Sequence, residues 1–304
     1  MREDVKMNWI NAFEIICYFI TFLLLKEIIR KRDKDEFFLF LSACLTGFIL
    51  ELLAVRLTGI YHYSDDYYIS IGIRPYQFPF FGGLMWGGLT VCALRLAKKF
   101  NFNTIMSSLF VGWIIVSMDI LLDVVAIRLD GGFWIWDGRA ITSTINHHMF
   151  MSVIWVNFLG YMFEVPSMVF LTLKYKRKKE KSNIKLLMMS VCISIATVII
   201  VGIASGVSLL LDSITDEWFS CIAFLILWFV IFLKTVSLVF KQRDKLSLSG
   251  EKDWTLLIFW MSIYAYCIAA LLHLGIIQDV PLYGIFAILL ASMTLCTVLV
   301  DVKK

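Results

Sequence analysis

Long apolar stretches separated by short polar segments make up most of the chain. Each stretch is close to the roughly 20 residues that a helix needs to cross a bilayer. We predict transmembrane helices at about residues 8–29, 36–59, 79–97, 103–128, 149–173, 184–211, 217–240, 254–277 and 281–301. The last two stretches leave a re-entrant hairpin open as an alternative. The pattern therefore predicts an all-α, polytopic bundle with about eight or nine spans.

Composition strengthens this prediction. Hydrophobic residues make up 60% of the 304 residues, and the mean hydropathy is +0.81, values that exclude a soluble protein. The net charge of +4 does not indicate nucleic-acid binding, because the basic residues lie in short loops between the apolar stretches. The seven cysteines fall within those stretches without a metal-type spacing, which favours small buried side chains. We expect a multi-pass protein of the cell membrane with a single membrane domain over residues 1–304; its oligomeric state is left open.

The basic residues predict an orientation. Lysine and arginine gather in every second loop, at residues 30–34, 98–99, 174–185 and 241–252, and Lys303 and Lys304 end the chain. The alternate loops hold few cations, such as Arg74 and Arg139. Basic loops remain on the cytoplasmic side of a membrane. The sequence therefore predicts an outer N-terminus and a cytoplasmic C-terminus.

The segment from Met118 to Trp136, MDILLDVVAIRLDGGFWIW, carries the most unusual chemistry in the chain. Asp119 and Asp123 stand four residues apart inside an apolar run, so on a helix they share one face. An acid at membrane depth is costly and indicates a functional site by default. We therefore expect these two carboxyl groups to act on the same neighbour.

Further acids lie in the first five predicted helices, at Glu14, Glu51 and Glu164. From the lengths of these helices, we expect the acids to gather mainly in the outer half of the membrane, away from matching lysines or arginines. Such acids can stay protonated, and two that share a site become one donor and one anion. Neutral acids that only join helices by hydrogen bonds are the alternative. We predict that residues 1–175 form the acid-lined catalytic half and residues 176–304 the supporting half.

Two long outer loops, about residues 60–78 and 129–148, are rich in aromatic residues. The first carries Tyr61 and Tyr63, and the second carries Trp134 and Trp136. Aromatic residues at this level form an interfacial belt in many membrane proteins. Two flaps that close the outer end of a cavity are the other interpretation, and composition favours neither.

Together these motifs resemble the membrane hydratases of carotenoid biosynthesis. The similarity begins at Glu51 in ELLAVRLTGIYHY, continues at Pro79 and Trp86, and is clearest in the aspartate pair followed by glycine and tryptophan-x-tryptophan. It closes with NFLGY from Asn157 to Tyr161 and covers about residues 40–175. These hydratases add water to the terminal double bond of an acyclic carotenoid end group. The resemblance therefore implies a lipid-soluble isoprenoid substrate.

The chain also departs from the pattern of that family. Val124 stands where the family usually has a proline after the second aspartate, and the segment after Trp136 lacks the family's proline-rich approach to the asparagine motif. These departures favour a divergent member, with a different isoprenoid substrate or with ring closure in place of hydration.

The chemistry expected of this site is protonation of a carbon–carbon double bond. Asp119 or Asp123 donates the proton, aromatic faces stabilise the tertiary carbocation, and Glu51 orients a water or acts as general base. If a second double bond reaches the cation before water does, the product is a ring. We expect no cofactor and no metal. The residues expected to contact the substrate are Tyr61, Tyr63, Trp86, Trp134, Trp136, Asn157 and Glu164.

Two other classes of function use similar residues. A proton-coupled transporter or lipid flippase would use the acids as a relay, but the repeats and broken helices that mark many transporters are not visible. An intramembrane prenyltransferase would hold magnesium diphosphate with aspartate-rich motifs. The chain has one such motif and no basic cluster beside it.

Among the remaining motifs, we interpret His147 and His148 as polar residues at the membrane interface, because the sequence offers no further metal ligand at a suitable spacing.

Overall fold

The computed structural model describes residues 8–136, 138, 140–176, 182–248 and 252–302. In this part of the chain, eight helices have the length and hydropathy to cross a membrane. The long helices are α1 (Trp9–Lys31), α2 (Lys34–Thr58), α3 (Phe80–Lys99), α4 (Thr104–Ala126), α5 (Trp155–Lys176), α6 (Asn183–Thr215), α7 (Trp218–Phe240), α8 (Trp254–His273) and α10 (Pro281–Leu299). The eight are α2 to α8 and α10. The predicted polytopic helical bundle is confirmed.

Short elements connect these helices. They are β1 (Tyr61–Tyr63), β2 (Ser70–Ile71), β3 (Phe78–Pro79), η1 (Leu129–Gly131), β4 (Trp134–Trp136), β5 (Met149–Phe150), β6 (Val153–Ile154), η2 (Arg243–Lys245), β7 (Leu246–Ser247), α9 (Ile276–Asp279) and β8 (Asp301–Val302). The fifth predicted span was placed too early, because residues 149–154 form the β5–β6 hairpin and α5 begins at Trp155. Met151 and Ser152 adopt left-handed conformations between these strands, as a two-residue hairpin turn requires.

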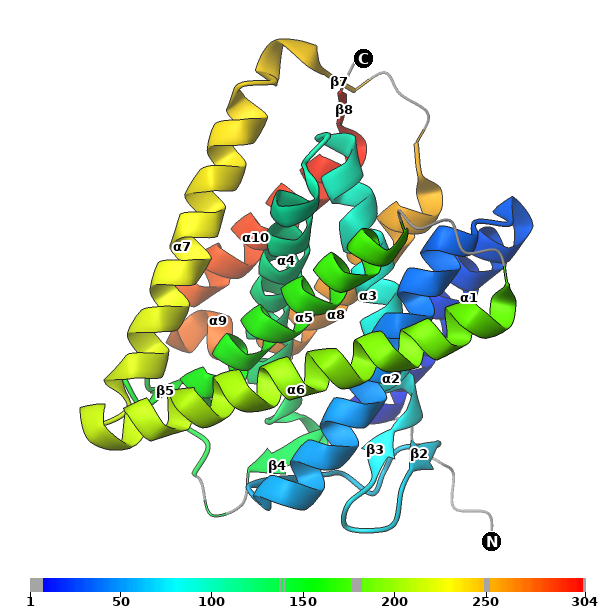
Figure 1. Ribbon diagram of the computed structural model, residues 1–304. Helices are drawn as coiled ribbons and strands as arrows, with labels where there is room; N and C mark the ends of the chain where they lie inside the picture. The colour runs from blue at the N-terminus through cyan, green and yellow to red at the C-terminus, as the bar shows by residue number, and fades with distance from the viewer. Residues whose placement is uncertain (1–7, 137, 139, 177–181, 249–251, 303–304) are drawn as a thin grey trace, which may run out of the picture.

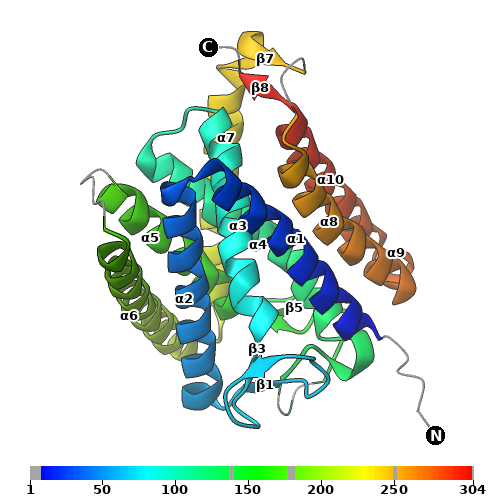
Figure 2. The ribbon, with the colours of Figure 1, turned by 90° about the vertical axis from the view of Figure 1, so that its right-hand side faces the viewer.

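Helix α4 forms the centre of the bundle. It packs against α3, α5, α7, α8 and α10, and most of its residues are buried (Figures 1 and 2). Helix α6 crosses obliquely over α2 and α5. The two final long helices, α8 and α10, lie side by side, with α9 between them in the chain. An acid on α4 is therefore held inside the protein, away from the lipid.

The end of the bundle that carries β1 to β4, here called the aromatic end, is closed by the two long loops. Strand β1 pairs with β4 in antiparallel register, which places Tyr61 opposite Trp136 and Tyr63 opposite Trp134. Glu14 of α1 accepts hydrogen bonds from the backbone N–H groups of Tyr68 and Ile69. These contacts fasten the first loop both to the second loop and to α1.

A buried ionic cluster fastens the opposite end, here called the basic end. Arg95 of α3 pairs with Glu36 of α2 at 2.7 Å, Glu27 of α1 at 3.3 Å and Asp253, the N-cap of α8, at 3.2 Å. Arg95 is only 9% exposed, and Glu27 and Glu36 are similarly buried. One guanidinium group therefore holds four helices together.

We expect Arg95→Met to destabilise the protein by about 3–5 kcal/mol, because Glu27 and Glu36 would lose their buried partner and keep only the more exposed Lys31 and Lys98. Thermal unfolding of the purified protein in detergent measures the effect. The matched control is Arg74→Met, which breaks an ion pair with Asp65 whose side chains are 69% and 58% exposed. That change should cost less than about 1 kcal/mol. Equal melting temperatures for Arg95→Met and wild type would contradict the role of the cluster.

Candidate active site

A cavity of about 90 Å³ lies beneath the aromatic end. Its walls come from α1 to α5, β1, β3 and β4, and aromatic side chains make up much of the lining. Three carboxyl groups face this space, from Glu51 on α2 and from Asp119 and Asp123 on α4. No lysine or arginine of the described residues is part of its lining. The three acids therefore share an apolar enclosure without a balancing cation.

Glu51 is surrounded by three phenol groups. The hydroxyls of Tyr61 and Tyr63 donate to Oε2 at 2.7 and 2.8 Å, and the hydroxyl of Tyr161 donates to Oε1 at 3.2 Å. Burial and the neighbouring Glu51 charge raise the pKa of Tyr61 and Tyr63 well above the ordinary value for tyrosine, so both hydroxyls keep their protons. Three neutral donors thus replace water around the Glu51 carboxylate.

Asp119 and Asp123 have a different environment. They are one helical turn apart on α4 and both line the cavity, and two carboxyl groups this close in an enclosure without a cation favour sharing one proton. Asn157 of α5 donates from Nδ2 to Oδ2 of Asp123 at 2.8 Å. Oδ2 of Asp119 is buried and has no hydrogen-bond partner among the described residues. The pair therefore combines an anchored acid with one that has a free oxygen.

The strand pair β1–β4 forms the roof of the cavity. Alternate residues of a strand point to the same side, so Tyr61 and Tyr63 face the cavity together, as do Trp134 and Trp136. The rings of Tyr61 and Trp136 are 5.1 Å apart, and those of Tyr63 and Trp134 are 6.2 Å apart. Of the two interpretations of these loops, the geometry favours flaps that close a cavity.

The side wall depends on close packing between α2 and α3. A Cβ atom added to Gly47 of α2 would lie 2.3 Å from Cδ1 of Trp86, so the absence of a side chain there allows the indole to lie against α2. The Trp86 ring also contacts that of Tyr161 at 5.0 Å. The sequence motifs included Trp86, but they gave no sign of the part played by Gly47.

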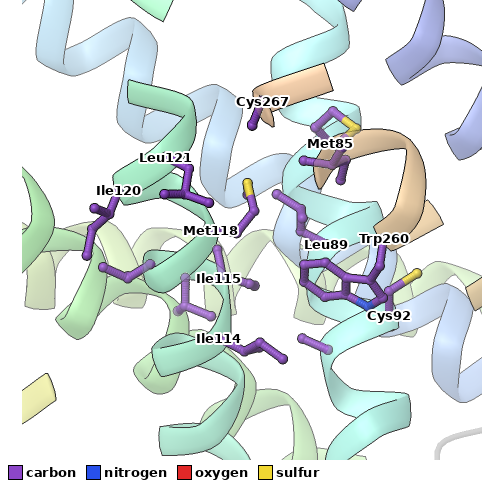
Figure 3. Close-up of a cluster of buried hydrophobic side chains, with 14 of the residues drawn as sticks. Met85, Leu89, Cys92, Ile114, Ile115, Met118, Ile120, Leu121, Trp260 and Cys267 are labelled. Carbon is purple, nitrogen blue, oxygen red and sulfur yellow. The ribbon is translucent and has the colours of Figure 1, made fainter. Parts of the chain in front are cut away.

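Apolar residues form the floor of the cavity. Met85 and Leu89 of α3 meet Ile115 and Met118 of α4, and Trp260 of α8 packs beside them (Figure 3). These lining residues of the floor are all apolar. The carboxyl groups are thus confined to the part of the cavity nearer the aromatic end.

The structure separates two of the predicted acids from this group. Glu14 is fully buried and accepts from Tyr18 in addition to the two backbone N–H groups of the first loop. Glu164 is 2% exposed and lies outside the cavity lining, and its Oε2 has no partner in the described part of the chain. Every other predicted site residue lines the cavity, namely Glu51, Tyr61, Tyr63, Trp86, Asp119, Asp123, Trp134, Trp136 and Asn157.

Several lining residues were not among the predicted site residues. Tyr161 lies four residues after Asn157, and this helical spacing places both side chains on one face of α5. Tyr67 and Phe81 also line the cavity, in segments whose aromatic content indicates no particular contact.

Val124, the departure from the family pattern, lies within α4, which continues to Ala126. A proline there would remove a backbone donor from the helix.

Comparison with known proteins gives a family and no individual relative. The family model described as carotenoid biosynthesis protein matches residues 11–227. No curated protein and no solved structure matches the chain. The matched region includes every residue that lines the cavity, and it covers well over half of the sequence. The chain therefore belongs to the family of carotenoid biosynthesis proteins, as a membrane protein of an isoprenoid pathway.

Proposed function

We propose that this protein is an enzyme of the cell membrane that adds water to the terminal double bond of an acyclic isoprenoid, such as a carotenoid end group. The observation that carries the proposal is the Asp119–Asp123 pair, one helical turn apart in an aromatic cavity whose described lining holds no cation. Such a pair favours sharing one proton, and the buried Oδ2 of Asp119, which has no partner among the described residues, is available to a ligand. The lipid-soluble substrate reaches such a site from within the membrane.

The reaction begins with proton transfer from Asp119 to the less substituted carbon of a trisubstituted double bond. The two electrons of the π bond form the new C–H bond, which leaves a tertiary carbocation and an Asp119 carboxylate. The faces of Tyr61, Trp134 and Trp136 stabilise the cation by about 1–2 kcal/mol each. In its ionised form, the Glu51 carboxyl group, which accepts hydrogen bonds from three phenols, supplies the counter-charge.

Water then adds to the carbocation. Its oxygen forms the C–O bond, and the proton that it loses returns to the aspartate pair, so the enzyme is restored and one water is consumed. Glu51 orients that water through Oε1, which accepts from a single tyrosine, or takes the proton as general base. Asn157 keeps Asp123 in place for the proton exchange.

Ring closure is the competing outcome of the same protonation. Two features favour hydration. Oδ2 of Asp119 and the indole N–H of Trp136 both belong to cavity-lining residues, and within the described residues neither has a hydrogen-bond partner. An acceptor and a donor of this kind suit a water molecule or a hydroxyl product. A cavity built only for cyclisation gains nothing from such groups.

A magnesium-dependent prenyltransferase receives no support from this geometry. Such an enzyme needs cations or metal ligands for a diphosphate, whereas the described lining offers a single aspartate pair and no lysine or arginine. One oxygen of that pair is already bound by Asn157. The pair is therefore better suited to hold a proton than a metal.

Expression in a host that supplies acyclic carotenoids tests the proposal. We expect a product heavier than the substrate by the mass of one water, detected by liquid chromatography and mass spectrometry. Asp119→Asn, Asp123→Asn and Glu51→Gln should each lower its rate of formation by about 10²–10⁴-fold, because each removes a group of the proton-transfer machinery. Asp279→Asn, at an exposed acid away from the cavity, is the control. A product of unchanged mass that is lost in the acid variants would instead establish a cyclase.

Tyr161→Phe tests the environment of Glu51. It removes one donor from the carboxylate and keeps the ring against Trp86. A hydrogen bond to a charged group contributes about 1.5–3 kcal/mol, so we expect product formation to fall by about 10–100-fold in protein that still folds. Tyr175→Phe on the same helix is the matched control. Equal activity of the two variants would contradict the role of Glu51 as counter-charge.

Gly47→Ala tests the side wall. Its Cβ atom would push Trp86 into the cavity, so we expect lower product formation even where the protein folds. Gly202→Ala on α6, where an added Cβ meets no atom within 4 Å, is the control. Activity of Gly47→Ala at the level of Gly202→Ala would show that the position of Trp86 does not limit the reaction.

A further inference from the structure

A second cluster of reactive side chains lies at the aromatic end, apart from the candidate active site. His147 and His148 come from the loop before β5, and Asp216 and Glu217 form the turn between α6 and α7. The two segments are 69 residues apart in sequence. A surface cavity of about 330 Å³ is lined by all four residues, so the cluster is open to an ion from outside.

The geometry points to a binding site for a divalent transition-metal ion, with Zn²⁺ as the best-suited ion, at His147, His148 and Asp216. One ligand atom from each of these residues lies within 4.8 Å of the other two. Nε2 of His147 is 3.4 Å from Oδ2 of Asp216. Two ligand atoms that each lie about 2.0 Å from a tetrahedral zinc are about 3.3 Å apart. The His147–Asp216 pair therefore already has the separation that a shared zinc ion requires.

Glu217 completes the arrangement around His148. Its Oε2 lies 3.2 Å from Nδ1 of His148. In metal centres, a ligating histidine usually donates its second ring N–H to a carboxylate, which fixes the orientation of the ring. Glu217 provides this contact and leaves the other ring nitrogen of His148 for the ion. The set of two imidazoles and a carboxylate, with an open position for water, is typical of zinc.

The histidine side of the cluster is held in place before any ion binds. Oδ1 of Asn146 accepts from the backbone N–H groups of His148 and Met149, and the indole N–H of Trp155 donates to the carbonyl of Asn146. The ring of His147 stacks on that of Trp218 with centroids 4.4 Å apart and an interplanar angle of 0°. The imidazoles therefore need little rearrangement to bind.

The acidic side is held at some conformational cost. Asp216 and Glu217 both adopt left-handed backbone conformations, with φ of 52° and 64°, which residues with a side chain rarely adopt in succession. Buried Asp212 accepts from the backbone N–H and the hydroxyl of Ser220 and so anchors the start of α7. This turn presents two carboxylates toward the histidines. Their ion pairs within the described part of the chain are with His147 and His148.

Metal binding would add a further link between the loop before β5 and the α6–α7 turn. The residues of α6 and α7 are largely exposed, whereas the loop before α5 continues into the helix that carries Asn157 and Tyr161. An ion held by both segments would fasten the α6–α7 turn to the base of the cavity wall. It would therefore stabilise the folded protein by an amount that rises with the logarithm of the free ion concentration once that concentration exceeds Kd.

Zinc titration of the purified full-length chain in detergent, with any affinity tag removed, tests this proposal. We expect one tightly bound Zn²⁺ per chain by calorimetry and elemental analysis, and a higher melting temperature in Zn²⁺ than in EDTA. His147→Ala, His148→Ala and Asp216→Asn should each weaken binding by at least about 100-fold, and Glu217→Gln by about 10–100-fold. His62→Ala and His273→Ala are matched controls, because they remove the two histidines outside the cluster.

Cobalt substitution tests the site in the wild-type chain, so its result does not depend on whether the variants fold. Co²⁺ bound to the wild-type chain should show the visible absorption bands of a coordinated ion with nitrogen and oxygen ligands, and Zn²⁺ should displace it. Absence of these bands, or zinc binding equal in wild type and His148→Ala, would overturn the proposal. In that case the four residues form ion pairs between two loops. Product formation from the candidate active site is measured separately, so failure of one proposal leaves the other standing.

Discussion

Carboxyl groups buried in a helical bundle without cations must be satisfied by neutral donors, and this constraint shapes the aromatic end of the protein. Glu51 accepts hydrogen bonds from two tyrosines of β1 and from Tyr161 of α5. Asp123 accepts one from Asn157, which is also on α5. The loops must therefore pack on the cavity for the acids to be tolerated. The strand pair β1–β4 therefore both covers the cavity and supplies two of the donors that its acids require.

At the basic end, the buried carboxylates are satisfied by cations and not by neutral donors. Arg95 pairs with Glu27, Glu36 and Asp253, and Lys31 and Lys98 add ion pairs to the two glutamates, so three cations face these three acids. Such a cluster holds helices together but leaves no proton to transfer. The two ends thus differ in how their buried acids are satisfied, by ion pairs at the basic end and by neutral donors at the aromatic end.

The C-terminal helices contact the cavity floor and the central helix α4 directly. Trp260 and Cys267 of α8 lie beside the floor of the cavity (Figure 3). The hydroxyl of Tyr283 at the start of α10 donates to the carbonyl of Ile120 on α4. These contacts position the central helix that carries both aspartates. The division into a catalytic half (residues 1–175) and a supporting half (residues 176–304) remains a prediction. The contacts of α8 and α10 show that the second half packs directly against the first.

The sequence alone determined the long helices and the candidate acids, because spans of a fixed length and side chains one helical turn apart follow from helix geometry. It placed Asp119 beside Asp123 and identified the tyrosines and tryptophans of the two loops. Only the tertiary structure paired β1 with β4, turned three phenols toward Glu51 and assigned Glu14 to the first loop. It also brought Asp216 to His147, across 69 residues of chain. Contacts of this kind depend on how distant segments pack, and no local spacing encodes them.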